Sequence, residues 1–252
     1  MSPNTKITQI KTVKKPKWNE DVPRLILYAD FMGFKSRVYS TEHATIKSLL
    51  ENFIDAFHRR LQPLQMGGNL KFVQFSDSIL VVVNGTDFKM FNLITKAAIC
   101  MMQEALRIKF GIKGVLAQGV FSFDDSKDLY FGRPLVDAYE LHEQIKYYGV
   151  VVHHSAENTV KNNMSESNPY SKSDIFIDKG PVAHYHLCWN LVDTKLAPKD
   201  ITSLCNSWLD SIEETVSGNP RQYIDKTRAI ITKDSKDNKT KKQDSQDEKE
   251  KI

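Results

Sequence analysis

Residues 70 to 83 contain two short apolar runs separated by Ser76 and Asp77, a spacing that is typical of a β-hairpin. After its first residue, the second run, Ser78 to Val83, consists of Ile, Leu and Val only. Continuous runs of this kind are typical of strands that are covered on both faces. The second strand of the hairpin is therefore expected in the interior of a packed sheet.

Asp30 and Asp77 each lie at one end of an apolar run. Leu25 to Ala29 precedes Asp30, and Asp77 precedes the run that ends at Val83. If the two strands are neighbours, the carboxylates face each other at one sheet edge and repel unless a cation lies between them. The pair therefore predicts a metal site. Taken alone, either aspartate is more typical of a turn, where its side chain bonds nearby backbone amides.

The composition is that of a globular protein. The chain has 252 residues, of which 40% are hydrophobic, so it can bury one sizeable core. No apolar run reaches the roughly 20 residues that span a bilayer, and residues 1 to 16 are polar and rich in lysine, unlike a secretory signal. Three widely spaced cysteines argue against a disulfide framework. We therefore expect a cytoplasmic protein.

The distribution of charge and apolar residues predicts three segments. Residues 1 to 20 form a flexible basic arm whose Trp18 can anchor it to the body, and residues 21 to 217 form one domain. Residues 218 to 252 are expected to be a charged, disordered tail, because the sequence beyond Asp225 offers almost nothing to bury.

Between the two ends, hydrophobic periodicity predicts alternating strands and helices. Helices are expected at 41–61, 87–109, 135–145, 156–161 and 201–216, and strands at 25–29, 70–75, 78–83, 111–123, 150–153, 174–178 and 182–188. Asp87 is a plausible N-cap of the second helix. This order predicts an α+β fold, a ferredoxin-like core whose mostly antiparallel sheet carries helices on one face.

Three motifs resemble those of class III nucleotide cyclase catalytic domains, and they occur in the family's order. Asp30-Phe-Met-Gly-Phe34 resembles the first metal-binding motif, and Asp77 within Phe75-Ser-Asp-Ser-Ile79 resembles the second metal aspartate. The run Tyr130 to Leu141 lies where the family carries a Gly-x-x-x-Asn-x-Ala-x-Arg helix start. The resemblance spans about residues 24 to 160 and implies a nucleotide cyclase of that fold.

The departures from the family pattern are informative. In a gap-free reading from Gly132, the family's Asn falls on Val136 and its transition-state Arg on Glu140, and the purine-selecting Lys falls on Val73. The run Gly132 to Leu141 is similar to the bacterial pyrimidine cyclases of Pycsar antiphage defence. That resemblance implies a homodimer with shared active sites that makes cyclic UMP or cyclic CMP from UTP or CTP and signals to a separate effector.

The resemblance also implies the roles of residues in the first two motifs. Asp30, Asp77 and the backbone carbonyl of Phe31 would hold two Mn²⁺ or Mg²⁺ ions. Met32, Gly33 and Phe34 would form a turn and helix start whose amides face phosphate oxygens.

Candidates for the transition-state cation and for base selection remain open at this point. Arg133 is the cation nearest to the family's helix start, and Lys35 and Arg37 follow the metal loop, but each is equally consistent with an exposed surface residue. Tyr130 or Tyr139 could narrow the base pocket, an interpretation that rests on aromatic size and hydrogen-bonding capacity.

The sequence is also consistent with three alternatives. The missing Asn and Arg are consistent with an inactive cyclase-fold domain that binds a nucleotide or a protein, although two repelling carboxylates have little use there. The basic arm with Phe72 and Phe75 is consistent with nucleic-acid binding, but both aromatics fit a core better. His184, His186 and Cys188 share one strand face as a possible zinc set, for which packing is the favoured reading.

Overall fold

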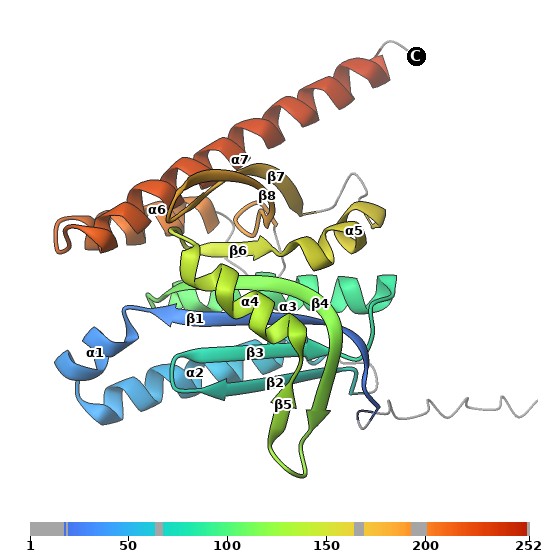
Figure 1. Ribbon diagram of the computed structural model, residues 1–252. Coiled ribbons are helices and arrows are strands. Elements are labelled where there is room, and N and C mark those ends of the chain that lie inside the picture. The colour runs from blue at the N-terminus through green and yellow to red at the C-terminus, as the bar shows by residue number, and fades with distance from the viewer. Residues whose placement is uncertain (1–17, 19, 64–67, 164–168, 193–200, 251–252) are drawn as a thin grey trace, which may run out of the picture.

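The computed structural model describes residues 18, 20–63, 68–163, 169–192 and 201–250, apart from the side chains of residues 238–250. The strands form an eight-stranded sheet of order β2-β3-β1-β4-β6-β8-β7, and β5 pairs with β4 off this path (Figure 1). The strands are β1 (Val22–Met32), β2 (Leu70–Phe75), β3 (Ser78–Val83), β4 (Gly111–Asp124), β5 (Leu129–Phe131), β6 (Gly149–Val152), β7 (Tyr170–Ile177) and β8 (Gly180–Leu187).

Seven helices accompany this sheet in the described part of the chain. They are α1 (Phe34–Ser40), α2 (His43–Leu61), α3 (Phe88–Arg107), α4 (Arg133–Gln144), α5 (His154–Asn162), α6 (Ile201–Glu213) and α7 (Asn219–Glu250). None of the helices in this part of the chain is long and apolar enough to cross a membrane.

The sheet is mostly antiparallel and is centred on β1. This strand pairs with β3 on one side and, over its whole length, with β4 on the other. β4 and β6 are parallel and are joined through α4, as a parallel pair requires a crossover connection. The α+β class predicted from the sequence is confirmed.

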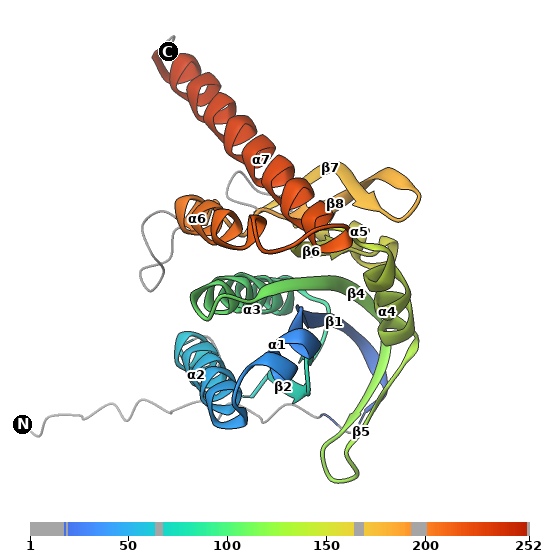
Figure 2. The same cartoon turned by 90° about the vertical axis from the view of Figure 1, so that its left-hand side faces the viewer.

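Side chains of β1 alternate between two hydrophobic clusters, one on each face of the sheet. Leu25 and Leu27 pack in the cluster that contains α2, α3 and α6, and Ile26 packs in the cluster that contains α4. Figure 2 shows α2 and α3 on one side of the sheet and α4 on the other. The prediction that helices cover one face is therefore wrong for α4, because periodicity identifies an inward side of a helix but not the sheet face it covers.

The predicted β2–β3 hairpin is confirmed residue for residue. Five of the six residues of β3 are buried, as expected for a strand covered on both faces. Asp87 caps α3, because its side chain accepts a hydrogen bond from the Met90 amide. The strand predicted at 174–178 begins earlier, because β7 starts at Tyr170, and residues 164–168 lie outside the described residues.

The C-terminal segment that was predicted to be disordered is helix α7, and its first half belongs to the core. Ile224 and Ile231 are buried, and Thr227 accepts a hydrogen bond from the Tyr148 amide at 2.8 Å. Tyr223 stacks on Tyr148 with ring centroids 5.5 Å apart. The few apolar residues are spaced three and four apart, so they align on one helical face despite the charged composition.

Trp18 anchors the chain ahead of β1, as predicted. Its ring lies 5.2 Å from the ring of Phe123, and its indole nitrogen donates to the Gly68 carbonyl at 3.0 Å. The guanidinium of Arg24 lies over the same indole and donates to the Trp18 carbonyl. The remainder of the predicted arm, apart from Glu20, lies outside the described residues.

Candidate functional site

Asp30 and Asp77 meet at one end of the sheet. Asp30 pairs with Ser78 across the antiparallel strands β1 and β3, and Asp77 lies in the turn just before Ser78. The Phe31 amide donates to the Asp77 carbonyl oxygen at 2.9 Å, which joins the turn to β1. The juxtaposition predicted from the sequence is therefore present in the backbone.

The Asp30 carboxylate has an incomplete set of partners. Its side chain is 19% exposed, and its Oδ2 accepts a hydrogen bond from the Tyr28 hydroxyl at 3.2 Å. Its Oδ1 is buried and has no hydrogen-bond partner among the described residues. Burial raises the pKa of Asp30, hydrogen bonds from Ser78 and Tyr28 lower it, and the charge of Asp77 raises it. Such a carboxylate is stabilised by an added cation.

The donors at this end of the sheet fit a hard divalent ion. Mg²⁺ and Mn²⁺ prefer carboxylate and carbonyl oxygens, and Asp30 offers an unpaired oxygen beside a second carboxylate. Asp30, Asp77 and the Phe31 carbonyl, the three ligands implied by the resemblance, all belong to the β1 end and the adjoining turn.

The turn and helix start expected at Met32, Gly33 and Phe34 are present. Gly33 has a left-handed backbone, with φ 73° and ψ 11°, and α1 begins at Phe34. A Cβ at Gly33 would meet no atom within 4 Å, so its backbone angle rather than space favours glycine here.

The structure gives Arg37 and Lys35, the cations after this turn, different roles. The Arg37 guanidinium lies over the Phe110 ring, 4.2 Å from its centroid, and donates to the carbonyls of Ile108 and Lys109. It thus packs against the end of α3, whereas Lys35 is exposed. Of these two cations, Lys35 is the exposed one.

Four further residues line the Asp30 carboxylate and were not predicted: Tyr28, Ser78, Lys113 and His142. Lys113 is 4% exposed and pairs with Asp30 across β1 and β4. Burial lowers the pKa of Lys113, while the charges of Glu143 and Asp30 raise it. Tyr28 could have been found from the sequence, since residues two apart in a strand share a face. Lys113 and His142 could not be found in this way, because they reach Asp30 only through the pairing of β1 with β4 and the packing of α4.

The predicted pocket tyrosines lie at different ends of the sheet. The Tyr139 ring on α4 meets the Tyr28 ring edge-on, with centroids 5.9 Å apart, so it is near Asp30. Tyr130 packs on Phe123 at 4.5 Å, ten residues along β4 from the position paired with Asp30. At roughly 3.3 Å per residue that is about 30 Å, so one chain does not bring Tyr130 to the aspartates.

Arg133 is also remote from the aspartates within one chain. Its side chain is 84% exposed and pairs with Asp137 at 3.5 Å. The neighbouring Pro134 packs at Gly119, six residues along β4 from Lys113, or about 20 Å at the strand rise. Val136 and Glu140, where the family pattern has Asn and Arg, are exposed on α4.

The structure also places two further pairs of residues, one of which was considered above for nucleic-acid binding. Phe72 packs on Phe57 with centroids 4.9 Å apart, as expected for a core residue, whereas Phe75 at the hairpin end is 83% exposed. His153 caps α5 and accepts from the Ser155 amide, and the His154 ring lies 4.0 Å from it.

Comparison with solved structures identifies the fold. The guanylate cyclase domain of RhGC from Catenaria anguillulae in complex with GTP is 13% identical, with a TM-score of 0.50 over 66% of this chain and 95% of that one. The monomeric guanylyl cyclase domain of RhoGC from Blastocladiella emersonii is 12% identical, with a TM-score of 0.52 over 66% of this chain and 94% of that one. No family model and no curated protein match the sequence.

The chain therefore has the fold of class III nucleotide cyclase catalytic domains. The alignment covers nearly the whole of each of these cyclase domains. At 12–13% identity the similarity shows the fold, and the activity has to be argued from the residues of this chain.

Proposed function

We propose that this protein is a metal-dependent pyrimidine nucleotide cyclase. It converts UTP or CTP to 3′,5′-cyclic UMP or CMP and pyrophosphate. The observation that carries the proposal is the pairing of Asp30 and Asp77 at one end of the sheet, with a buried, unpartnered oxygen on Asp30. A buried carboxylate beside a second one costs stability, and a bound cation offsets that cost.

In this reaction the ribose 3′-oxygen bonds to the α-phosphorus, the bond to the β-phosphate oxygen breaks, and the 3′-hydroxyl proton is released. Two Mn²⁺ or Mg²⁺ ions, when bound by Asp30, Asp77 and the Phe31 carbonyl, would supply charge neutralisation of the triphosphate and a lowered pKa at the 3′-hydroxyl. The Tyr28 hydroxyl orients the Asp30 carboxylate through its hydrogen bond to Oδ2. The Gly33 turn holds the amides that start α1 beside this carboxylate.

The pyrimidine preference is supported by the face of the sheet on which Asp30 lies. Val73 pairs with Leu80, and Leu80 pairs with Tyr28, so these residues form a row across β2, β3 and β1. Val73 and Tyr28 pack in the same cluster, and Tyr139 from α4 contacts Tyr28. Val73 is apolar where the family has a purine-reading lysine, and Tyr28 and Tyr139 add aromatic bulk on the same face. These residues favour a base pocket narrower than one that holds a purine.

A homodimer with shared sites is part of the proposal. Arg133 is about 20 Å along β4 from the aspartates in its own chain, so it can serve only a partner's site. The surface around Arg133 carries exposed apolar side chains from β4, β5 and α4, namely Val120, Leu129, Phe131 and Val136. Exposed apolar patches of this kind are typical of protein interfaces.

The biological role that we propose is antiphage signalling, in which the cyclic pyrimidine nucleotide activates a separate effector. This part rests on the resemblance of Gly132 to Leu141 to the Pycsar cyclases. The second candidate is an inactive cyclase-fold domain that binds a nucleotide or a protein. It is favoured by Val136 and Glu140 at the positions of the family's Asn and Arg, both exposed on α4.

The decisive experiment is incubation of the purified protein with ATP, GTP, CTP and UTP separately in the presence of Mn²⁺. Cyclic products and pyrophosphate are measured, with Asp77→Ala in parallel. One cyclic pyrimidine product that disappears in the variant supports the proposal, whereas a cyclic purine product overturns the pyrimidine assignment. If no nucleotide reacts, titration with nucleotide and Ca²⁺ tests the inactive binding domain.

A further inference from the structure

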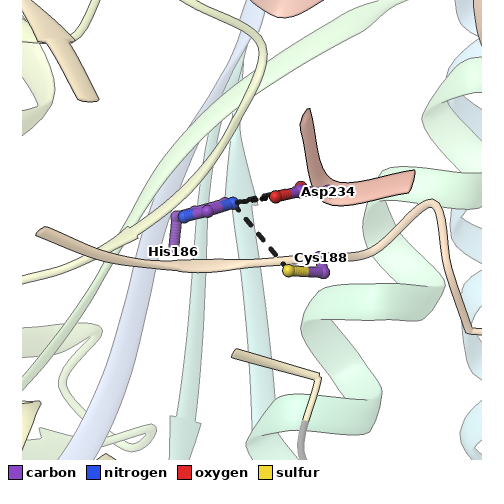
Figure 3. Close-up of side chains that lie close together, drawn as sticks. All are labelled: His186, Cys188 and Asp234. Carbon is purple, nitrogen blue, oxygen red and sulfur yellow. Dashed lines mark hydrogen bonds and ion pairs between the residues drawn. The ribbon is translucent and has the colours of Figure 1, made fainter. Parts of the chain in front are cut away.

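A second group of metal-ligating side chains lies at the junction of β8 and α7. His186 on β8, Cys188 just after that strand and Asp234 on α7 point toward one another (Figure 3). All three are buried, with exposures of 0%, 6% and 3%, and their ligand atoms lie within 4.8 Å of one another. The proposed cyclase reaction uses none of these residues.

This group differs from the zinc set that the sequence suggested, which was His184, His186 and Cys188. His184, which alternates with His186 and Cys188 along the strand, is not part of the group. Asp234 joins it instead, 48 positions beyond His186 and in the segment predicted to be disordered. A ligand from a separate element is typical of a folded metal site, which joins parts of the chain that are distant in sequence.

We propose that His186, Cys188 and Asp234 bind a structural zinc ion. Zinc takes imidazole nitrogen, thiolate sulfur and carboxylate oxygen as ligands in tetrahedral sites. Bond lengths of roughly 2.0–2.1 Å to nitrogen or oxygen and about 2.3 Å to sulfur place tetrahedral ligands about 3.3–3.5 Å apart. His186 Nε2 lies 3.0 Å from Asp234 Oδ1 and 3.8 Å from Cys188 Sγ, distances that bracket this range.

A zinc ion would account for both contacts of His186 Nε2 at once. Asp234 and Cys188 approach the same atom, His186 Nε2, and an imidazole nitrogen has one hydrogen or one lone pair to offer. A bound dication coordinates the nitrogen, oxygen and sulfur together. It would also neutralise the buried Asp234 carboxylate and the Cys188 thiolate that forms when the ion binds.

Tyr147 is a further buried polar residue in this part of the core. Its hydroxyl is buried and has no hydrogen-bond partner among the described residues. Burial raises the pKa of Tyr147 well above its ordinary value, and the charges of Asp234 and Cys188 raise it further. A zinc ion bound by His186, Cys188 and Asp234 would link α7 to β8 and thereby stabilise the C-terminal part of the core.

The test is metal analysis of the full chain, which requires no nucleotide turnover. The protein is stripped with a chelator, reloaded with Zn²⁺, desalted and analysed for metal. About one zinc per chain is expected, with retention lost in Cys188→Ser and Asp234→Asn. The matched control is Cys205→Ser, since Cys205 is a buried cysteine outside the group and this variant should keep its zinc.

Loading with Co²⁺ distinguishes this group from the Asp30–Asp77 pair. A thiolate ligand gives cobalt an intense near-ultraviolet charge-transfer band, which carboxylates do not give. We expect this band in the wild-type protein and in Asp77→Ala, and its loss in Cys188→Ser. Failure of the wild-type protein to retain zinc, or cobalt loading without a thiolate band, would overturn the proposal. Both outcomes are measured on the wild-type protein, so the test does not depend on whether the variants fold.

Discussion

The Oδ2 atom of Asp30 lies 3.6 Å from Nε2 of His142, but the imidazole does not supply a counter-charge. Burial, aided by the charge of Lys113, lowers the pKa of His142 to about 3, so the ring is neutral at physiological pH. The ring packs edge-on against Tyr28, with centroids 5.1 Å apart. The buried Lys113 is the neighbouring cation whose charge lowers the pKa of Asp30, but burial and the like-charged Asp77 still leave that pKa raised, so an added cation would stabilise the carboxylate.

The first prediction concerns Asp30→Asn. Binding of Mn²⁺ should weaken by more than about a hundredfold, because even outer partners of metal ligands cost 10- to 100-fold. The metal-free variant should melt at a higher temperature than the wild-type protein at pH 7.5. The raised pKa of Asp30 means that ionisation disfavours the folded state, so its cost grows as pH rises above the ordinary carboxyl value of 3.8.

Calorimetric titration with Mn²⁺ and melting curves in chelator check this prediction. The gain in melting temperature should shrink as pH falls toward the ordinary carboxyl value of 3.8, and it should vanish below that value as Asp30 becomes protonated in both states. Asp125→Asn is the matched control, since this aspartate lies in another hairpin turn and is exposed. Unchanged Mn²⁺ affinity in Asp30→Asn would remove this residue from the metal site.

The second prediction separates the two pocket tyrosines. Tyr139→Ala should change the ratio of activities on CTP and UTP by up to about tenfold, because an aromatic contact contributes roughly 0.5–1.5 kcal/mol. Tyr130→Ala should leave the ratio unchanged, since that ring packs on Phe123 and lies outside the Tyr28–Tyr139 contact proposed to shape the base pocket. Initial rates with each nucleotide provide the measurement. A shifted ratio in Tyr130→Ala with none in Tyr139→Ala would contradict this assignment.

Local sequence signals were sufficient for most strands and helices, and for placing Asp30 and Asp77 each at one end of a strand. Each aspartate follows or precedes an apolar run, and the hairpin brings Asp77 to the end of β3. The order of strands in the sheet then places β1 beside β3. In the sequence analysis this pairing was only a condition of the metal site, because periodicity says nothing about the neighbours of a strand.

The parts that sequence reasoning missed depend on contacts between distant elements. Lys113 and His142 join the Asp30 environment through strand pairing and the packing of α4. The first half of α7 was missed because the prediction of disorder relied on the charged composition of residues 218–252 and not on the helical spacing of their few apolar residues. The role of Asp234 as a candidate ligand was missed for the same reason, because it lies in the segment that was predicted to be disordered.

The third prediction tests α7 as part of the core. Ile224 is fully buried, so Ile224→Ala should lower the free energy of unfolding by about 2–5 kcal/mol. Thr232→Ala on the exposed side of the same helix should change it by no more than about 0.5 kcal/mol. Urea unfolding followed by circular dichroism measures both. Equal stabilities of the two variants would mean that α7 does not contribute to the cooperative core.

The fourth prediction concerns the cap of α5. His153 Nδ1 lies 2.9 Å from Ser155 Oγ and accepts from the Ser155 amide, so the cap needs an unprotonated nitrogen. Burial lowers the pKa of His153, and the charge of His154 lowers it further. The stabilisation is therefore fully present above the unfolded value of about 6.5 and is lost as pH falls below it.

His153→Asn should keep the cap and lose its dependence on pH, because asparagine is a good N-cap and does not titrate. Between pH 7.5 and pH 5 the wild-type protein should lose a few tenths of a kcal/mol more stability than the variant, a small figure because the ring is only half-buried. Urea unfolding at both values measures the difference. His43→Gln, which alters an exposed histidine on α2, serves as the control and should follow the wild-type protein. Parallel pH profiles for wild type and His153→Asn would show that the imidazole does not cap α5 in solution.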